Sequence, residues 1–208
     1  MRVDIPFTIN PDGWHCIHAA MQGVIKHFTN DYVSIGFLNA LMNPDHEMWV
    51  WPFQAVKSMD ELGLFVRLFS SYDLSSFQTA ESIRESFPGR YCDLTCVNSV
   101  KESISHIQSN SLSENKDLSL SEIEGFIARG CVPIVMMGCR ERLGKYVILT
   151  GYDSSSLYYH DSGPEGAEPH KRISKKDFLD CWKETPSNNM AIIVYGKKYK
   201  DTYTRFHF

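Results

Sequence analysis

The residue of this chain best suited to covalent chemistry is a cysteine within the stretch NPDGWHCIHAAMQG. Cys16 stands where turn-forming residues give way to an alanine-rich apolar run, which is where a helix should begin. The partial positive charge at the start of a helix favours a thiolate and lowers the pKa of a thiol. Cys16 is therefore a candidate nucleophile. The alternative is a structural thiol, because free cysteine is among the most buried residue types.

Histidines are the usual proton acceptors for such a thiol. His15 and His18 flank the cysteine, but residues one or two positions apart on a helix do not face each other, so these rings could line a pocket instead. His160 precedes Asp161 on an expected strand, where alternation sends the two side chains to opposite faces. Only one of them can then face Cys16, and we expect His160 to be structural or at the surface.

Two cysteines and three tryptophans have spacings that could serve a metal site or a ligand cleft. Cys92 and Cys96 are close enough to form one ligand pair for zinc, but structural zinc sites need a second pair and none is convincing here. We therefore expect no metal and no cofactor. Three tryptophans could wall a ligand cleft, although at such spacings they more often belong to the core: Trp14, Trp49 and Trp51.

Helices are expected to position Cys16. Apolar residues at spacings of three and four predict a helix over residues 14–28 with one apolar face, and further helices near 32–42 and 51–63. A β-rich run, LFVRLFSS, follows the glycine that ends the third helix and is a candidate first strand. Residues 1–70 should form a mainly helical half.

The remainder of the chain changes from polar loops to strands. Residues 73–116 are serine-rich and weakly periodic, with a helix expected near 99–108 and a mobile loop tip at SNSLSENKD. A capped helix, SLSEIEGFIARG, then leads into the apolar strand CVPIVMMG. Three more strands are expected at KYVILTGYD, SLYYHDSG and MAIIVYGKK, with the helix SKKDFLDCWKE before the last one. Residues 119–198 should form a mainly antiparallel half of one domain spanning 1–208.

Composition excludes several classes of protein. The 208 residues are 43% apolar, 12% aromatic and 22% charged, which is typical of a soluble globular protein. The net charge of -4 arises from 25 acidic and 21 basic residues spread along the chain, so no nucleic-acid partner is expected. No segment has the roughly 18 apolar residues that a membrane span requires. We expect a cytoplasmic protein with reduced cysteines, and the sequence indicates no particular oligomeric state.

The order of these parts resembles the papain-like cysteine peptidases. The segments GCVPIVMMG, GKYVILTGYDSSSLYYHDSG and RISKKDFLDCWK resemble the bacteriocin-processing, double-glycine-leader peptidase branch. NPDGWHCIHAAM is similar to the segment in which that family keeps its oxyanion-hole glutamine and its cysteine. The resemblance implies an α+β, papain-like fold. N-terminal helices, with the cysteine at the start of one of them, would pack on a C-terminal antiparallel sheet.

The same resemblance implies roles for individual residues. Asp161 matches the residue that orients the catalytic base, and Asn10 stands six residues before Cys16, where the family has glutamine. The family's catalytic histidine is replaced here by Lys145. Lysine has an ordinary pKa of about 10.4, so near neutral pH it is charged and cannot accept the thiol proton. Asparagine is one methylene shorter than glutamine, so an oxyanion contact would need a shifted loop.

Three functions remain open at this point. The chain could be a cysteine hydrolase acting on a peptide or amide with an altered Cys16, Lys145 and Asp161 site, in which lysine serves as acid or, if desolvated, as base. It could be a pseudopeptidase that binds a peptide or small amide ligand without cutting it. It could also be an interaction module without a cleft. A decayed triad predicts an ion pair between Lys145 and Asp161 near Cys16.

Overall fold

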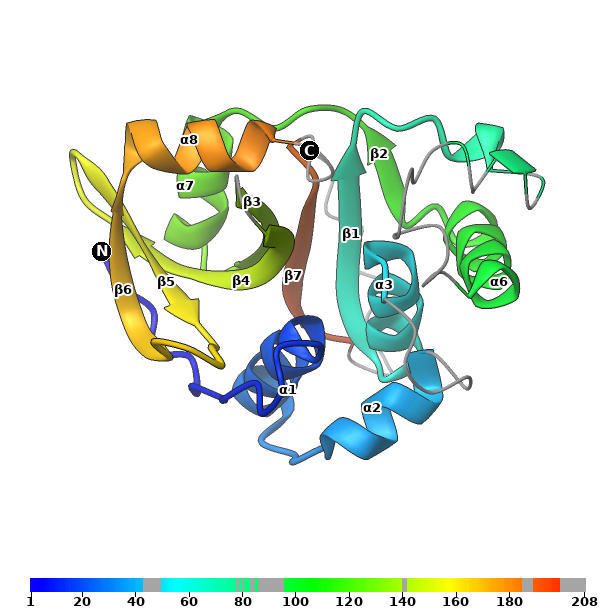
Figure 1. Ribbon diagram of the computed structural model, residues 1–208, viewed down its shortest axis with the longest axis horizontal. Coiled ribbons are helices and arrows are strands. Elements are labelled where there is room, and N and C mark those ends of the chain that lie inside the picture. Colours follow the sequence, from blue (N-terminus) through cyan, green and yellow to red (C-terminus); the bar gives the residue numbers. More distant parts are fainter. Residues whose placement is uncertain are drawn as a thin grey trace.

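A mixed sheet with helices on both faces organises the chain (Figure 1). The computed structural model describes residues 1–42, 50–77, 79, 81, 82, 85, 96–139, 142–184 and 189–198. The helices are α1 (Cys16–Thr29), α2 (Ile35–Met42), α3 (Pro52–Glu61), α6 (Val97–Ser109), α7 (Leu120–Ala128) and α8 (Lys175–Lys183). The strands are β1 (Leu64–Ser70), β2 (Ser113–Asn115), β3 (Val132–Cys139), β4 (Arg142–Tyr152), β5 (Ser156–Asp161), β6 (Glu168–Ser174) and β7 (Ala191–Lys197). A short 3-10 turn covers Leu74–Ser76.

The seven strands lie in the order β2-β1-β7-β3-β4-β5-β6. Every pair is antiparallel except β1 with β2. The α+β architecture expected from the sequence is therefore confirmed, with the four predicted C-terminal strands and the candidate first strand in one sheet. None of the described helices is long and apolar enough to cross a membrane.

The two strands at the edges of the sheet were not predicted. β2 forms inside the segment SNSLSENKD, where a mobile loop tip was expected, and β6 has the sequence EPHKRIS. Both strands are mostly exposed, so they lack the apolar alternation by which a half-buried strand is recognised. Backbone pairing with β1 and β5 forms these strands, and pairing partners cannot be read from a local pattern.

Strand β3 is almost wholly apolar because both faces of the sheet are covered. Along β3, Ile134 and Met136 belong to one core cluster, whereas Val135 and Met137 belong to the other. Helices α1, α3 and α6 contribute to the first cluster, and α7 and α8 contribute to the second. This covering explains why CVPIVMMG has no polar alternation.

Helix α1 begins two residues later than the apolar pattern predicted, at Cys16 instead of residue 14. Its first ten residues are all buried, and it packs on β4 and β7. It ends at Asn30, which adopts the left-handed conformation with a φ of 62° and donates its N–H to the carbonyl of Lys26. The burial of α1 fixes the position of its N-terminus against the sheet.

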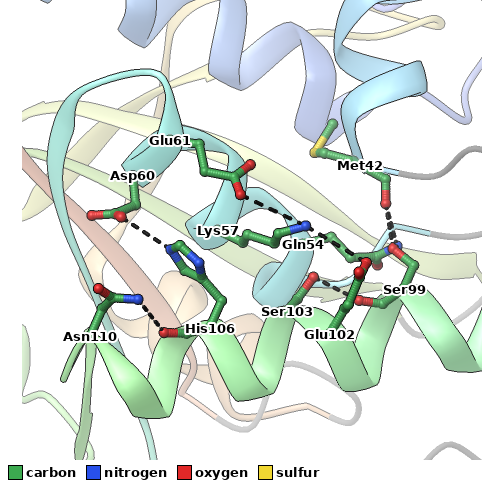
Figure 2. Close-up of polar contacts among 10 residues, drawn as sticks. All are labelled: Met42, Gln54, Lys57, Asp60, Glu61, Ser99, Glu102, Ser103, His106 and Asn110. Atoms are coloured by element: carbon green, nitrogen blue, oxygen red, sulfur yellow. Dashed lines mark hydrogen bonds and ion pairs between the residues drawn. The ribbon is translucent and has the colours of Figure 1, made fainter.

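Polar side chains join α3 to α6 (Figure 2), two helices that share a core cluster with α1. Gln54 accepts a hydrogen bond from the N–H of Trp51 and donates to the carbonyl of Met42 at 2.8 Å and to Ser99 Oγ at 3.0 Å. At the other end of α3, His106 Nε2 lies 3.1 Å from Asp60 Oδ2. These contacts satisfy partly buried polar groups, so the cluster holds two helices together.

A close approach between α1 and the N-terminal segment gives a test of this packing. A Cβ atom added at Gly23 would lie 2.6 Å from the Pro6 carbonyl oxygen and 3.2 Å from Ile148 Cδ1. We expect Gly23→Ala to lower the free energy of unfolding by about 1–3 kcal/mol, because a backbone atom must move to admit the methyl group. Urea denaturation followed by circular dichroism would measure the change.

The matched control is the same substitution in an open helical position. At Gly36 in α2, the added methyl group meets only Ser34 Oγ, at 4.0 Å. Gly36→Ala should not lower the free energy of unfolding and can raise it by up to about 1 kcal/mol, because alanine has the higher helix propensity. Equal stability of the Gly23→Ala and Gly36→Ala variants would contradict the close approach of α1 to Pro6.

Candidate functional site

Cys16 lies where the first turn of α1 meets the sheet. Its side chain is 5% exposed, and the backbone N–H of Tyr146 on β4 donates to Cys16 Sγ at 3.5 Å. Tyr146 directly follows Lys145, so the cysteine and the lysine come from elements that are in contact. The predicted meeting of helix and sheet at Cys16 is present in the structure.

Asn10 organises the loop that leads into α1. Its Oδ1 accepts hydrogen bonds from the N–H groups of Gly13 at 3.2 Å and His15 at 3.1 Å, with a longer one of 3.4 Å from Asp12. Its own N–H donates to the carbonyl of Ser162 at 2.8 Å, which ties the loop to the end of β5. The side-chain nitrogen, Nδ2, is buried and has no hydrogen-bond partner among the described residues. One amide donor therefore remains available beside the start of α1.

Asp161 carries two cations on one carboxylate oxygen. Lys145 Nζ lies 2.6 Å from Asp161 Oδ2, and Lys171 Nζ lies 2.9 Å from the same atom. The Asp161 side chain is 1% exposed. Burial by itself would raise the pKa of this carboxyl, but the hydrogen bonds and charges of the two lysines outweigh burial and lower it. Asp161 is therefore a stable carboxylate, and the ion pair expected of a decayed triad is present.

Lys171 is a site residue that the sequence did not reveal. It lies on β6, the edge strand that has no apolar alternation. In the β5–β6 ladder Lys171 pairs with Tyr159, and the register shifts between Tyr159 and Asp161, which brings the lysine to the carboxylate. Only knowledge of the β5–β6 pairing could have placed Lys171 in the site.

The thiol of Cys16 is less acidic than the sequence suggested. Burial is the largest influence and raises its pKa. The N–H groups of Tyr146, Ile17 and Cys16 itself, together with the charge of Lys145, act in the opposite direction without offsetting burial. The expectation that the helix start lowers this pKa is therefore wrong in sign, because desolvation of a thiolate outweighs the helix-end effect. Near neutral pH the group is a neutral thiol.

The histidines close to Cys16 in sequence are held by contacts of their own. His15 Nδ1 lies 2.8 Å from Asp12 Oδ2. The ring of His18 lies 4.7 Å from that of His15 and is 1% exposed. Burial and the charge of His15 lower the pKa of His18 to about 4, although Asn39 and Asp12 act in the opposite direction. His18 is therefore an uncharged interior residue near neutral pH.

His160 is a buried structural residue, which is one of the two positions expected of it. The Ile5 carbonyl, 2.8 Å from Nε2, can only accept, so Nε2 must carry the proton. The Nδ1 atom accepts the N–H of His170 at 3.2 Å. The ring of His160 also lines a cavity of about 10 Å³ with Tyr146 and Thr8, enough for about one water molecule.

The aromatic and zinc hypotheses have separate outcomes. Trp51 is fully buried in the core beside α3, whereas Trp14, two residues before Cys16, is 52% exposed. Trp49 and Cys92 lie outside the described residues, so neither the third tryptophan nor the Cys92 and Cys96 pair is placed. Of the two tryptophans that the structure describes among these three, Trp14 is the one at the surface.

Hydrogen bonds link the four residues proposed from the sequence directly or through their neighbours. Lys145 is bonded to Asp161, and Cys16 accepts from the N–H of Tyr146, the residue after Lys145. Asn10 is bonded to His15 and Ser162, the neighbours of Cys16 and Asp161. The arrangement offers a thiol, a carboxylate holding two ammonium groups, and one unpartnered amide donor. The two ammonium groups and the amide can donate hydrogen bonds to a ligand. None of the rings of His15, His18 and His160 is hydrogen-bonded to the Asp161 carboxylate, so this carboxylate orients none of them as a base.

Comparisons with known proteins agree with the architecture. No family model matches the sequence, and no curated protein does. The peptidase domain of Streptococcus ComA, a bifunctional ABC transporter involved in a quorum sensing pathway, matches with a TM-score of 0.55 and 18% identity over 93% of this chain and 100% of that domain. A protein from Bacillus anthracis described as a C39-like peptidase matches with a TM-score of 0.57 and 10% identity over 96% of this chain and 100% of that one. The chain has the papain-like α+β fold of these C39-like peptidase domains.

Proposed function

We propose that this chain is a peptidase-like protein that binds a peptide or small amide ligand at the Cys16 site and does not hydrolyse it. The proposal rests on one observation above all, the 2.6 Å ion pair between Lys145 and Asp161. In the papain-like peptidases an imidazole occupies the place of this lysine and removes the thiol proton. Here that place is taken by an ammonium group, which has no lone pair to accept a proton.

Two further features make turnover unfavourable. The pKa of Cys16 is raised by burial, so few molecules carry a thiolate near neutral pH. Asp161 is also bonded to Lys171, so the carboxylate that would orient a base holds two cations instead. The site lacks both an activated nucleophile and the group that would activate it.

Other features support ligand binding. The buried Asn10 side chain keeps an unpartnered Nδ2 donor at the start of α1, within the described part of the chain. Trp14 offers an exposed indole two residues before Cys16. An amide donor and an exposed aromatic ring suit a peptide or amide group, which presents a carbonyl oxygen and apolar side chains.

The first test is the reactivity of the unmodified protein. At mildly acidic pH, Cys16 should be alkylated by iodoacetamide more slowly than Cys96 and Cys181, which are more exposed. Mass spectrometry of peptides would give the order of labelling. The protein should also hydrolyse an activated ester no faster than its Cys16→Ala variant does.

A Cys16-Lys145-Asp161 hydrolase is the second candidate, because the positive charge of Lys145 acts to lower the pKa of the thiol. In that case the ammonium would stabilise a thiolate and protonate the leaving amine. Preferential alkylation of Cys16, together with ester turnover that is lost in Lys145→Ala, would favour this candidate. Those two results would reject the non-hydrolytic proposal.

A further inference from the structure

Two ammonium groups in the site converge on a single carboxylate oxygen. The Nζ atoms of Lys145 and Lys171 lie 2.6 Å and 2.9 Å from Asp161 Oδ2. Their separation therefore cannot exceed the sum of these two distances. The other carboxylate oxygen, Oδ1, accepts only a long hydrogen bond of 3.4 Å, from the N–H of Gly163, among the described residues. Both ammonium groups are therefore bonded to the same oxygen atom, Asp161 Oδ2.

The group therefore carries one uncompensated positive charge. Neither lysine has a second acidic partner in the described part of the chain. Cys16 does not supply the missing negative charge, because burial keeps it as a neutral thiol. Asp12, the acidic residue of the loop before α1, is paired with His15. Each ammonium also has three donor hydrogens and uses one of them on Asp161.

The charge is presented towards solvent. The Lys145 and Lys171 side chains are 30% and 37% exposed, whereas the Asp161 side chain beneath them is 1% exposed. An incoming anion can thus reach the ammonium donors without displacing Asp161. The charges of Lys145 and Lys171 repel each other, and Asp161 offsets only one of them. A second anion would reduce the remaining repulsion.

Asn10 is bonded to the residues next to Asp161 and Cys16. Asn10 donates its N–H to the carbonyl of Ser162, the residue after Asp161, and its Oδ1 accepts from the N–H of His15, the residue before Cys16. Its side chain is buried, and the Nδ2 atom has no partner among the described residues. A buried donor without a partner is costly, and a ligand oxygen would satisfy it.

We infer that Lys145 and Lys171 form a binding site for a carboxylate group, such as the terminal carboxylate of a peptide. A carboxylate carries one negative charge, which equals the uncompensated charge of the site, whereas a phosphate dianion would overcompensate it. The inference rests on the proposed function, because it names the group by which a peptide ligand would be held. Lys171 then has a role in binding that does not depend on the chemistry of Cys16.

The test compares two ligands that differ in one group, N-acetyl-glycylglycine and its C-terminal amide. Each is titrated into isotope-labelled protein while the amide signals of Tyr146 and Gly163 are followed by NMR. The acid should bind at least about tenfold more tightly than the amide, since it gains a charge-assisted hydrogen bond. Lys171→Gln should weaken binding of the acid by about tenfold and leave binding of the amide unchanged.

Control variants separate the charge from the fold. Lys171→Arg keeps the charge and should retain the preference for the acid. Lys116→Gln removes a lysine that pairs with Glu122 away from the site, and it should change neither affinity. The thermal midpoint of each variant shows whether the fold is intact.

Three outcomes of the binding experiment would reject the inference. Equal affinities for the acid and the amide would exclude a carboxylate site and leave peptide binding standing. Inorganic phosphate that binds more tightly than the acid would identify a phosphate site instead. No binding of either peptide would reject the inference and the proposed peptide binding together. Ester turnover by the unmodified protein would reject only the non-hydrolytic part of the proposed function.

Discussion

Lys145→His is expected to create esterase activity that depends on Cys16. An imidazole with an ordinary pKa of about 6.5 accepts a proton near neutral pH, which the ammonium of Lys145 cannot do. Asp161 already lies in the place from which it would orient that ring. Because a positioned general base contributes about 10²- to 10⁴-fold to rate, hydrolysis of an activated ester should rise clearly above the level of the unmodified protein. Alkylation of Cys16 near neutral pH should accelerate as well.

Lys171 limits how far this variant can succeed. It would still hold Asp161 Oδ2 and compete with the new imidazole for the carboxylate. The double variant Lys145→His with Lys171→Gln should therefore be more active than Lys145→His alone, while Lys171→Gln alone should show no activity. Adding Cys16→Ala to the double variant should abolish turnover. Absence of activity in both histidine variants, with circular dichroism unchanged, would mean that the site cannot be restored and that binding is its function.

The second large effect concerns pH and the buried histidine of α1. In the folded chain His18 has a pKa of about 4, compared with 6.5 for an exposed histidine. Below pH 6.5 the unfolded chain takes up a proton that the folded chain does not, so the free energy of unfolding falls as pH drops from about 6.5 to about 4. The difference between the two pKa values corresponds to a loss of about 3 kcal/mol across this range. Urea denaturation at a series of pH values would measure it.

His18→Gln provides the control for this effect. The variant keeps a polar side chain but cannot take up a proton, so its stability should depend less steeply on pH over the same range. Any loss of packing would appear separately, as a difference in the free energy of unfolding between the variant and the unmodified protein that persists near neutral pH. His160, whose pKa is also lowered by burial, should leave a smaller slope in the variant. A slope as steep as that of the unmodified protein would contradict the assignment to His18.

The elements that position the site could be predicted where their patterns are local. Helix α1 follows from its apolar periodicity, and strands β3 and β4 follow from their apolar runs. The meeting of helix and sheet at Cys16 was implied by the resemblance to the papain-like peptidases. Edge strands β2 and β6 were missed because backbone pairing forms them and their side chains are polar. Lys171 was lost with β6.

The electrostatics of the site were harder to predict than its location. A cysteine at a helix start has a lowered pKa only when water or donors compensate for burial, and the sequence does not reveal that Cys16 is 5% exposed. Asn10 shows a similar limit. Its position six residues before the cysteine was recognised by resemblance, but its use of Oδ1 to organise the NPDG loop follows from three-dimensional contacts. That contact leaves Nδ2 as the donor of the amide.

The contact between Cys16 and Tyr146 also bears on how the chain folds. The two residues are separated by 130 positions, and the hydrogen bond between them closes nearly two thirds of the sequence into one loop. Contacts of such separation carry a large entropic cost, so they form after local helices and hairpins such as β4–β5. We therefore expect docking of α1 on the sheet to be a late step in folding. Shielding of the Cys16 sulfur from solvent would accordingly report late tertiary assembly, long after secondary structure has appeared.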